Sequence, residues 1–370
     1  MSKENYRRLG DYIREVDVRN RDLEVKELVG LTINKAFIPS VANTIGTDLS
    51  NYKVIRKEQF ACSLMQVSRD GKMPVAMFEG ECAIMSPAYP MFEVVDKNIL
   101  LPQYLMMWFS RNEFDREASF YAVGGVRGSL TWQDFCDMTL PIPPIEQQRK
   151  IVAQYEAASR KIRLNERMIT RLEETAQTLY HKMFVDGIDK ENLPEGWRME
   201  TLGEVANILD YKRRPLSAAQ RALIKGEYPY FGAMSIIDYI NDYIFDGVFL
   251  LFAEDGYVTD KDGHPNLQYI YGKFWLNNHA HIMQGNDIVS TEYIYLALKE
   301  SIVIHLVTGA AQPKINQENM STIPIIVPPQ IVMQQFNRKI CLIFNYKKLK
   351  ETENIELIRL QSLLLAKMRQ

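Results

Sequence analysis

The chain repeats itself after 185 residues, and this internal repeat limits the folds that are open to it. Residues 124–144 read GGVRGSLTWQDFCDMTLPIPP, and residues 309–329 read GAAQPKINQENMSTIPIIVPP. The Pro-Pro pairs that close these segments lie 185 residues apart, which is half of the 370-residue chain. Leu-Gly pairs also lie near the start of each half, at residues 9–10 and 202–203. Units of about 20–50 residues form solenoids, so this longer repeat indicates a duplicated domain with pseudo-two-fold symmetry, which suits two copies of a partner.

The composition is that of an ordinary folded protein without a strong overall charge. The formal charge is −2 and the sequence pI is about 6.3, so nucleic-acid binding must come from local patches. The four cysteines form no C-x-x-C pair, which favours a reducing cytosol and buried thiols. The opening residues, MSKENYRRLG, lack the apolar core of a signal peptide, and no segment has the roughly 18 apolar residues of a membrane helix. We therefore expect a soluble, cytoplasmic protein.

Each half of the chain predicts a mixed block of strands and helices that is followed by a long helix. Residues 102–114 predict a surface helix, because Leu105, Trp108 and Phe109 recur at the spacing of one helical face. Residues 293–304 predict the matching helix in the second half. Short apolar clusters bounded by turn sequences predict strands at residues 75–78, 83–85 and 249–252.

Residues 151–183 predict a coiled-coil helix. Apolar residues recur there in heptads for more than four repeats, without Gly or Pro. Asn165 interrupts the apolar seam, which fixes the register of a pair at some cost in stability. The predicted seam consists of Ile151, Tyr155, Ala158, Ile162, Asn165, Ile169, Leu172, Ala176, Leu179 and Met183.

A second long helix is predicted from Pro328-Pro329 to the end of the chain. Its seam is apolar at both ends and polar in the middle, so the sequence predicts the helix better than its register. Two helices of about 33 residues, each about 50 Å long, can pair antiparallel; a helical hairpin inside a core is the alternative. Shifting the first seam by 185 residues gives Phe336, Ile340, Ile343, Lys347, Lys350, Asn354, Leu357, Gln361, Leu364 and Met368.

Five strings of the sequence follow the pattern of one known family, in the expected order. They are GLTINKAFIPSVANTIGTDLSNYKVIRKEQFA at residues 30–61, LPIPPIEQQRKIV at 140–152, LPEGWRMETLGEVANI at 193–208, YPYFGAMSIIDYINDYIFDGVFLLFAEDG at 228–256 with AQPKI at 311–315, and VPPQIVMQQF at 327–336. Over its whole length the chain resembles the specificity (S) subunit of type I restriction-modification systems. It departs from the family at residues 212–215, where KRRP replaces a Gly/Thr-rich opening loop.

The resemblance implies an α+β fold with two tandem α/β target-recognition domains. Each domain is followed by a long helix, and the two helices pair as an antiparallel coiled coil with pseudo-two-fold symmetry. The expected divisions are residues 1–143 for target-recognition domain 1, 144–186 for the central conserved coiled-coil helix, 187–328 for target-recognition domain 2, and 329–370 for the C-terminal conserved coiled-coil helix.

The sequence lacks the motifs of enzymes that modify or move DNA. It has no Gly-rich cofactor loop with an Asn/Asp-Pro-Pro-aromatic motif, no P-loop and no G-x-S-x-G serine. His279 and His281 would face the same side of a strand, but no Cys or third His is near, so we expect a packed or DNA-facing pair and no metal site. Glu254 and Asp255 precede Gly256, which favours a turn over acid–base catalysis.

Side chains that match the donors and acceptors of base edges are Arg, Lys, Asn, Gln and Ser on turns or strand ends. Arg127 lies in the Gly-rich loop GGVRGS, and the 185-residue shift pairs it with Gln312, next to Lys314. Glycine at these positions lets a backbone approach DNA closely. For each candidate, a solvated surface role is the alternative. The DNA-binding candidates are Asn34, Lys35, Ser68, Arg69, Lys72 and Arg127 in the first domain, and Lys212, Arg213, Arg214, Lys261, Lys273, Asn277, Asn278, Gln312 and Lys314 in the second.

These observations and the resemblance predict a non-catalytic subunit that recognises a bipartite, asymmetric DNA target. Expected partners are double-stranded DNA, two methyltransferase subunits and restriction/motor subunits, with no membrane. No cofactor is expected in this chain, since S-adenosylmethionine, ATP and Mg belong to the partners. A structural coiled-coil adaptor, or the specificity subunit of a fused cutting-and-methylating system without a separate motor, are the alternatives. Helix pairing and partner docking are expected at Ile151, Tyr155, Ile162, Asn165, Ile169, Leu172, Leu179, Ile340, Ile343, Leu357 and Leu364.

Overall fold

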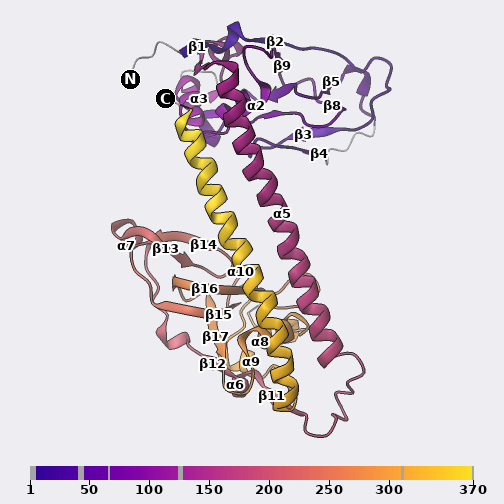
Figure 1. Ribbon diagram of the computed structural model, residues 1–370, viewed down its shortest axis with the longest axis vertical. Coiled ribbons are helices and arrows are strands. Elements are labelled where there is room, and N and C mark those ends of the chain that lie inside the picture. Colours follow the sequence, from indigo (N-terminus) through magenta and orange to yellow (C-terminus); the bar gives the residue numbers. More distant parts are fainter. Residues whose placement is uncertain (1–5, 41–45, 66, 124–127, 310–311, 369–370) are drawn as a thin grey trace. The chain divides into compact units, whose positions relative to one another are not determined.

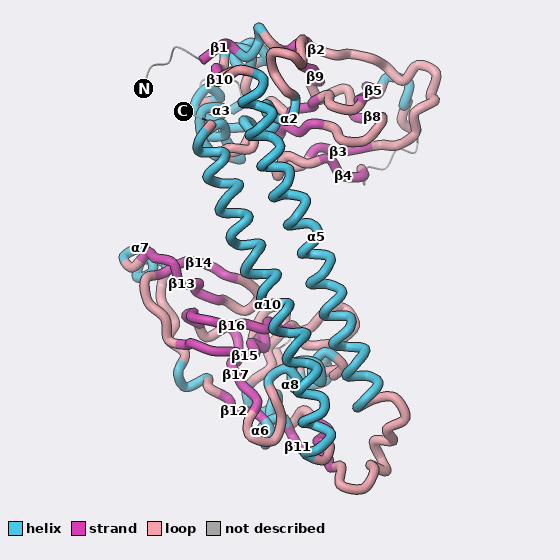
Figure 2. The backbone as a smooth tube through the Cα atoms, viewed as in Figure 1, coloured by secondary structure: helices cyan, strands magenta, loops and turns pink. Residues whose placement is uncertain are grey.

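The computed structural model describes residues 6–40, 46–65, 67–123, 128–309 and 312–368 (Figures 1 and 2). The chain forms two compact units: unit 1 comprises residues 1–164 and 353–370, and unit 2 comprises residues 165–352. The two long helices are α5 (Ile145–Phe184) and α10 (Gln330–Lys367), and each contributes to both units.

The described strands of unit 1 are short and pair antiparallel. They are β1 (Tyr6–Arg8), β2 (Ile13–Glu15), β3 (Val29–Leu31), β4 (Phe37–Pro39), β5 (Lys53–Arg56), β6 (Phe60–Cys62), β7 (Val75–Met77), β8 (Cys82–Met85), β9 (Met91–Val94) and β10 (Thr139–Pro141). One sheet has the order β2-β9-β6-β7, and the pairs β1-β10, β3-β4 and β5-β8 form separate two-stranded sheets. The strands predicted at residues 75–78 and 83–85 are thus confirmed as β7 and β8.

The helix predicted at residues 102–114 is wrong in two respects. It divides into α2 (Pro102–Phe109) and α3 (Asn112–Ala122), and α2 is buried rather than exposed. The cause is aromatic packing: the ring of Phe109 lies edge-on to Phe60 and Phe92, at centroid distances of 5.9 and 6.2 Å. Within the described residues, the remaining short helices of unit 1 are η2 (Leu9–Asp11), η3 (Leu49–Asn51), α1 (Val67–Asp70) and α4 (Trp132–Asp137).

Unit 2 is built on a six-stranded sheet in the order β12-β17-β15-β16-β13-β14. These strands are β12 (Ala206–Ile208), β13 (Lys225–Phe231), β14 (Ile236–Ile240), β15 (Phe245–Ala253), β16 (Leu267–Leu276) and β17 (Ala280–Gly285). β13 and β16 pair parallel, while the other neighbours pair antiparallel. The strand predicted at residues 249–252 lies inside β15. The successive residues Phe249 to Ala253 are all buried, so both faces of the strand are covered there.

The described helices of unit 2 are α6 (Leu202–Val205), η5 (Asp210–Lys212), α7 (Ala218–Leu223), α8 (Thr291–Lys299), η6 (Ile304–Leu306) and α9 (Gln317–Ser321), together with the adjoining parts of α5 and α10. Among them, α8 packs on β15, β16 and β17. The helix predicted at residues 293–304 is confirmed in position as α8, but it ends at Lys299. Its Tyr293 ring packs against Phe184 of α5 at 4.9 Å, and Phe184 packs against Phe336 of α10 at 5.0 Å.

The two units share a set of equivalent hydrogen bonds, which confirms the internal repeat. Leu9 N donates to Met138 O, and Leu202 N donates to Ile323 O, both at 2.8 Å. β1 pairs with β10 in unit 1, as β11 (Arg198–Thr201) pairs with β18 (Pro324–Val327) in unit 2. A tyrosine from the covering helix also reaches the last strand of each unit: Tyr104 Oη donates to the Pro141 carbonyl, as Tyr293 Oη does to the Ile326 carbonyl.

The Leu-Gly pairs of the repeat have a packing reason. A Cβ on Gly10 would lie 2.9 Å from Cys136 Cβ, and one on Gly203 would lie 3.1 Å from Ser321 Cβ. Cys136 lies on α4, and Ser321 lies on α9. Both helices begin with a side-chain cap, Thr131 accepting from Asp134 N and Asn316 accepting from Asn319 N. A Cβ at Gly10 would force its neighbours to shift, and one at Gly203 would make a tight contact, so glycine favours the close backbone approach at both positions.

The predicted seams of α5 and α10 consist of residues that are buried or half-buried, and their roles in helix pairing and partner docking stay predictions. No predicted seam position of either helix is exposed. In unit 1, Gln361 Nε2 donates to Ser159 Oγ at 2.6 Å. In unit 2, Lys347 Nζ lies 2.7 Å from Glu173 Oε1. The polar middle of the α10 seam is thus accommodated by polar contacts, and within each unit the two helices run antiparallel (Figure 1).

Two further expectations concern the cysteines and the membrane. Cys62 and Cys136 are buried, as expected, but the expectation is wrong for Cys341, which is exposed on α10. Within the part of the chain that the structure describes, no helix has both the length and the apolar character needed to cross a membrane.

Candidate nucleic-acid interface

Charged side chains from four segments of unit 2 form a connected network at the end of β15. Arg213 follows η5, Glu254 follows β15, and Lys314 lies in the loop before α9. Arg213 Nη1 donates to Glu254 Oε2 at 2.6 Å, and Lys314 Nζ lies 2.8 Å from Glu254 Oε1. One carboxylate therefore holds cations from two loops that are distant in sequence.

His281 and Asp210 complete this network from beneath. His281 Nδ1 lies 2.5 Å from Asp210 Oδ2, and its Nε2 lies 2.8 Å from the Ile315 carbonyl oxygen. The other Asp210 oxygen accepts a hydrogen bond from Ile282 N at 2.9 Å. Because the His281 side chain is only 1% exposed, its ring ties β17 to the Lys314 loop from inside the unit.

The same residues contain the donor atoms that a metal would use, but their contacts do not fit a metal centre. Ligand atoms of Asp210, Glu254 and His281 lie within 4.8 Å of one another. Both Glu254 oxygens already face cations, and Arg213 Nη2 also lies 3.3 Å from Asp210 Oδ2. A further cation would be repelled by Arg213 and Lys314. The arrangement is an ion-pair network that fixes loops.

The network shifts the pKa values of Glu254 and Lys314 in the directions that favour their charged forms. Burial alone would raise the pKa of Glu254, but hydrogen bonds from Lys314 and Arg213 lower it below its ordinary value. The hydrogen bond to Glu254 likewise raises the pKa of Lys314. Both groups are therefore ionised at neutral pH, and the Lys314 loop is held by charge as well as by its backbone.

His279 behaves differently from His281, although they are two residues apart. β17 begins at Ala280, so the expectation that both rings face one side of a strand is wrong. The His279 side chain is 49% exposed, and its Nδ1 lies 2.8 Å from Asp255 Oδ2. Asn277 is buried, and its Oδ1 accepts from His279 N at 2.9 Å, which fixes the turn. The pair therefore consists of one packed and one exposed histidine, and the Glu254-Asp255 turn carries structural ion pairs.

The structure brings most second-domain candidates to this one surface, but not all of them. Backbone bonds join the neighbouring loops here, since Glu254 N donates to His279 O and Gly256 N donates to Pro313 O. Arg213 and Asn277 are withdrawn from the surface by the contacts above, so we leave them out of the proposed interface. Lys261 lies on a separate exposed turn, and Lys273 lies on β16. The exposed candidates on the loops joined by the network are Lys212, Arg214, Asn278, Gln312 and Lys314.

Sequence analysis missed two aromatic side chains beside these loops. Tyr211 is 77% exposed next to Lys212, and Tyr257 is 82% exposed next to Gly256. Exposed aromatic rings beside cations can stack on bases or sugars of nucleic acids. Their positions in the sequence could have revealed them. Tyr211 directly precedes the basic segment 212–214, and Tyr257 directly follows the Asp255-Gly256 turn.

In unit 1, some of the predicted residues gather around a cavity of about 190 Å³. Asn34, Lys35 and Lys72 line it together with Asp115. Lys35 Nζ lies 2.8 Å from Asp115 Oδ1, and both side chains are almost fully buried. Burial lowers the pKa of Lys35, although the Asp115 carboxylate opposes the shift. Lys35 therefore serves an internal ion pair and is left out of the proposed interface, whereas Lys72 is exposed.

The other candidates of unit 1 lie at the neighbouring turn. Ser68 Oγ donates to the Gly128 carbonyl at 3.4 Å, which joins α1 to the end of the Gly-rich loop. Arg69 is exposed and pairs with Asp70, its Nε lying 2.7 Å from Oδ1. Arg127 lies outside the described residues, so its prediction is unchanged. The counterpart of this loop in unit 2 is the one that carries Gln312 and Lys314.

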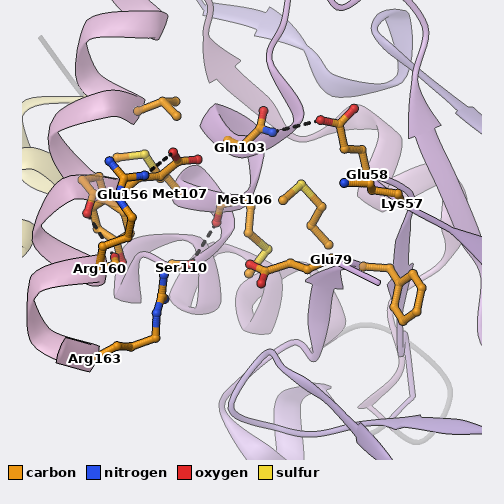
Figure 3. Close-up of a pocket in the computed structure, with 15 residues that line it drawn as sticks. Lys57, Glu58, Glu79, Gln103, Met106, Met107, Ser110, Glu156, Arg160 and Arg163 are labelled. Carbon is orange, nitrogen blue, oxygen red and sulfur yellow. Dashed lines mark hydrogen bonds and ion pairs between the residues drawn. The ribbon is translucent and has the colours of Figure 1, made fainter. Parts of the chain in front are cut away.

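A second cavity of unit 1, of about 350 Å³, lies between α2 and α5 (Figure 3). Met77, Met106 and Met107 supply apolar lining, and charged residues surround them. Glu58 accepts from Gln103 Nε2 at 3.0 Å on one side, while Arg160 of α5 lies on another. Methionine side chains adapt their shape to a partner, so this lining suits contact with another protein.

Comparisons with known proteins agree with this architecture. The family described as "Type I restriction modification DNA specificity domain" matches residues 194–358. A candidate type I restriction enzyme specificity subunit of Haemophilus influenzae, S.HindORF215P, is 35% identical over 147 residues, which is 39% of this chain and 37% of that protein. The MjaIX specificity subunit of a type I restriction enzyme from Methanocaldococcus jannaschii is 21% identical over 275 residues, or 66% of this chain and 62% of that one. The chain thus spans less than two thirds of either relative.

The fold is also similar to that of a solved structure over nearly its full length. The crystal structure of the S subunit of a type I restriction-modification system from M. genitalium aligns with a TM-score of 0.61 at 15% identity. The alignment covers 98% of this chain and 95% of the other. At this identity the likeness establishes a common fold.

Proposed function

We propose that the chain is a specificity subunit of the type I restriction-modification kind, which recognises one DNA sequence and directs partner enzymes to it. It is a non-catalytic subunit, and its own chemistry is recognition. The observation that carries the proposal is the loop surface of unit 2. There, a buried network of Arg213, Glu254 and His281 fixes loops whose exposed neighbours are cations, amides and aromatic rings.

The division of labour on this surface follows from the chemistry of DNA. Lys212, Arg214 and Lys314 suit phosphate contacts, which position a protein on the duplex. Asn278 and Gln312 are amides, which suit the base edges of the major groove. In unit 1 the corresponding roles fall to Ser68, Arg69 and Lys72, with Asn34 beside them.

We propose that the target is bipartite and asymmetric. The two units share an arrangement of strands, caps and hydrogen bonds, yet their loops differ in sequence. Each unit would read one half of the target, and the different loops would read different bases. The paired α5 and α10 would set the number of base pairs between the two halves.

The partners in this proposal are two methyltransferase subunits and restriction/motor subunits, acting in the cytoplasm. S-adenosylmethionine, ATP and Mg would be bound by those partners. The methionine-lined cavity between α2 and α5 in unit 1 supports docking of a methyltransferase subunit there, because an apolar, adaptable lining with a charged rim is typical of a protein contact (Figure 3).

The decisive experiment maps methylated adenines across the genome of a host that carries the matching methyltransferase subunit, with and without this gene. We expect a split motif with a fixed gap that loses methylation only when the gene is absent. An unchanged methylome, with the chain copurifying with the methyltransferase but showing no salt-dependent binding to duplex DNA, would indicate a structural adaptor instead.

A further inference from the structure

We propose that His279 is a specificity-determining residue of unit 2, which accepts a hydrogen bond from the exocyclic amino group of adenine or cytosine in the major groove. Asp255 is its positioning residue. This inference rests on the proposed function, because it assigns a reading role to one side chain of the same loop surface.

The geometry fixes which nitrogen of His279 is offered to a ligand. Nδ1 lies 2.8 Å from Asp255 Oδ2 and 3.1 Å from Oδ1. A carboxylate only accepts, so Nδ1 carries the hydrogen in this pair. In the neutral ring, Nε2 is then the acceptor. Among the residues that the structure describes, Nε2 has no hydrogen-bond partner, and half of the side chain is exposed.

The supporting groups keep this ring in place. The Asp255 side chain is 21% exposed, and its backbone forms a bridge with Lys314. His279 O accepts from Glu254 N, and His279 N donates to Asn277 Oδ1. The ring is thus anchored at its backbone and at one nitrogen, which is the preorganisation that discrimination between bases requires.

The chemistry separates His279 from the cations around it. A neutral acceptor gains nothing from a phosphate oxygen, whereas Lys212 and Lys314 do. In the major groove, the donors are the N6 amino group of adenine and the N4 amino group of cytosine. A ring with a free Nε2 acceptor therefore selects these bases over guanine and thymine. The contrast with His281 is direct, because both of its ring nitrogens already face acceptors within the unit.

The test uses the complex with its methyltransferase subunits and a library of duplexes in which each position of both half-sites is varied. His279→Ala is expected to reduce discrimination about 5- to 10-fold at one base pair of one half-site, which is the scale of a single base-edge hydrogen bond. Non-specific duplex binding should be unchanged. His305→Ala is the matched control, because His305 is an exposed histidine elsewhere in unit 2.

Asp255→Asn is a second variant, and a purely structural role of this pair would not predict its effect on base preference. The asparagine amide can donate to Nδ1, which moves the ring hydrogen to Nε2 and turns that nitrogen into a donor. At the same base pair, preference should then shift towards guanine or thymine, whose O6, N7 and O4 atoms accept. This readout remains available if His279→Ala does not fold.

The outcomes distinguish a failure of the proposed function from a failure of the role assigned to His279. If the wild-type complex methylates without sequence preference, the proposed function fails. If the wild type is specific but His279→Ala and Asp255→Asn keep its discrimination at every position, only the role of His279 is overturned. Equal loss at all positions, in contrast to His305→Ala, would also overturn it, because a phosphate contact or a folding defect acts without regard to one base pair.

Discussion

Lys35 and Asp115 form a buried ion pair in unit 1, with Nζ 2.8 Å from Oδ1 and side chains 9% and 10% exposed. The same carboxylate oxygen accepts from Met73 N at 3.1 Å. The pair therefore joins the β3-β4 hairpin to α3 and to the chain before β7. Its burial gives it a different role from the exposed lysines nearby.

Lys35→Ala should lower the free energy of unfolding by about 2–4 kcal/mol, because it leaves the Asp115 carboxylate buried without its cation. Lys72→Ala is the matched control from the same cavity, and it should change stability by less than about 0.5 kcal/mol. Denaturant unfolding measures both. Duplex binding at low salt should weaken for Lys72→Ala; similar stability losses for the two variants would contradict the assignment.

Glu254→Gln should lower stability at pH 7 by about 1–3 kcal/mol, because a neutral amide cannot match the charged hydrogen bonds to Arg213 and Lys314. The pKa of Glu254 is lowered in the folded protein from an ordinary 4.5, so its carboxylate stabilises the fold above that pH. This stabilisation is lost as the pH falls through the folded value.

The pH dependence of Glu254→Gln gives the sharper readout. As the pH falls below 4.5, wild-type stability should decline more steeply than that of the variant. Glu356→Gln is the control, because Glu356 pairs with Arg359 on an exposed face. Parallel curves for wild type and Glu254→Gln would show that the network contributes no linked proton.

Gly10→Ala should destabilise unit 1 by about 1–3 kcal/mol, because its Cβ would lie 2.9 Å from Cys136 Cβ in a packed contact. Gly203→Ala should have a smaller effect, since the equivalent distance to Ser321 Cβ is 3.1 Å. Gly30→Ala is the control, because a Cβ there has nothing within 4 Å. Thermal unfolding of the three variants tests the order, and an equal shift for Gly10 and Gly30 would refute it.

Removing one heptad from each long helix, residues 160–166 and 354–360, should shorten the gap of the recognised motif by about three base pairs. Seven residues span about 10 Å of helix, and base pairs rise about 3.4 Å each. Methylome sequencing reads the gap directly. An unchanged gap in a folded, active variant would exclude the helices as the determinant of spacing.

Much of the fold could be predicted from the sequence because its signals are local or periodic. Heptads predicted the α5 seam, and the 185-residue shift carried the prediction to α10, where Lys347 and Gln361 have polar contacts with α5. The split of residues 102–114 into α2 and α3 could not be predicted. It depends on Phe109 inserting between rings that arrive from distant strands.

The candidate site could be predicted only in outline. The Gly-rich loop GGVRGS and the basic segment at residues 212–214 could be recognised in the sequence. The structure joins the basic segment to the Lys314 loop, because Arg213 and Lys314 both contact Glu254. Which side chains stay free could not be read from the sequence, since Lys35 and Arg213 look like neighbouring lysines and arginines until their carboxylate partners are known. Ion-pair choice is a tertiary property.

Unit 1 is completed by the last residues of the chain, and this bears on how the protein is made. Met368 and Leu365 pack in the same apolar cluster as Val152, whereas unit 2 is one continuous segment. At about 5–20 residues per second, a ribosome needs roughly 10–40 s to pass from Val152 to Met368. Nearly all of that interval is spent on unit 2, whose last residue, Thr352, is made before Met368. The block that is synthesised first therefore receives its final packing contacts last.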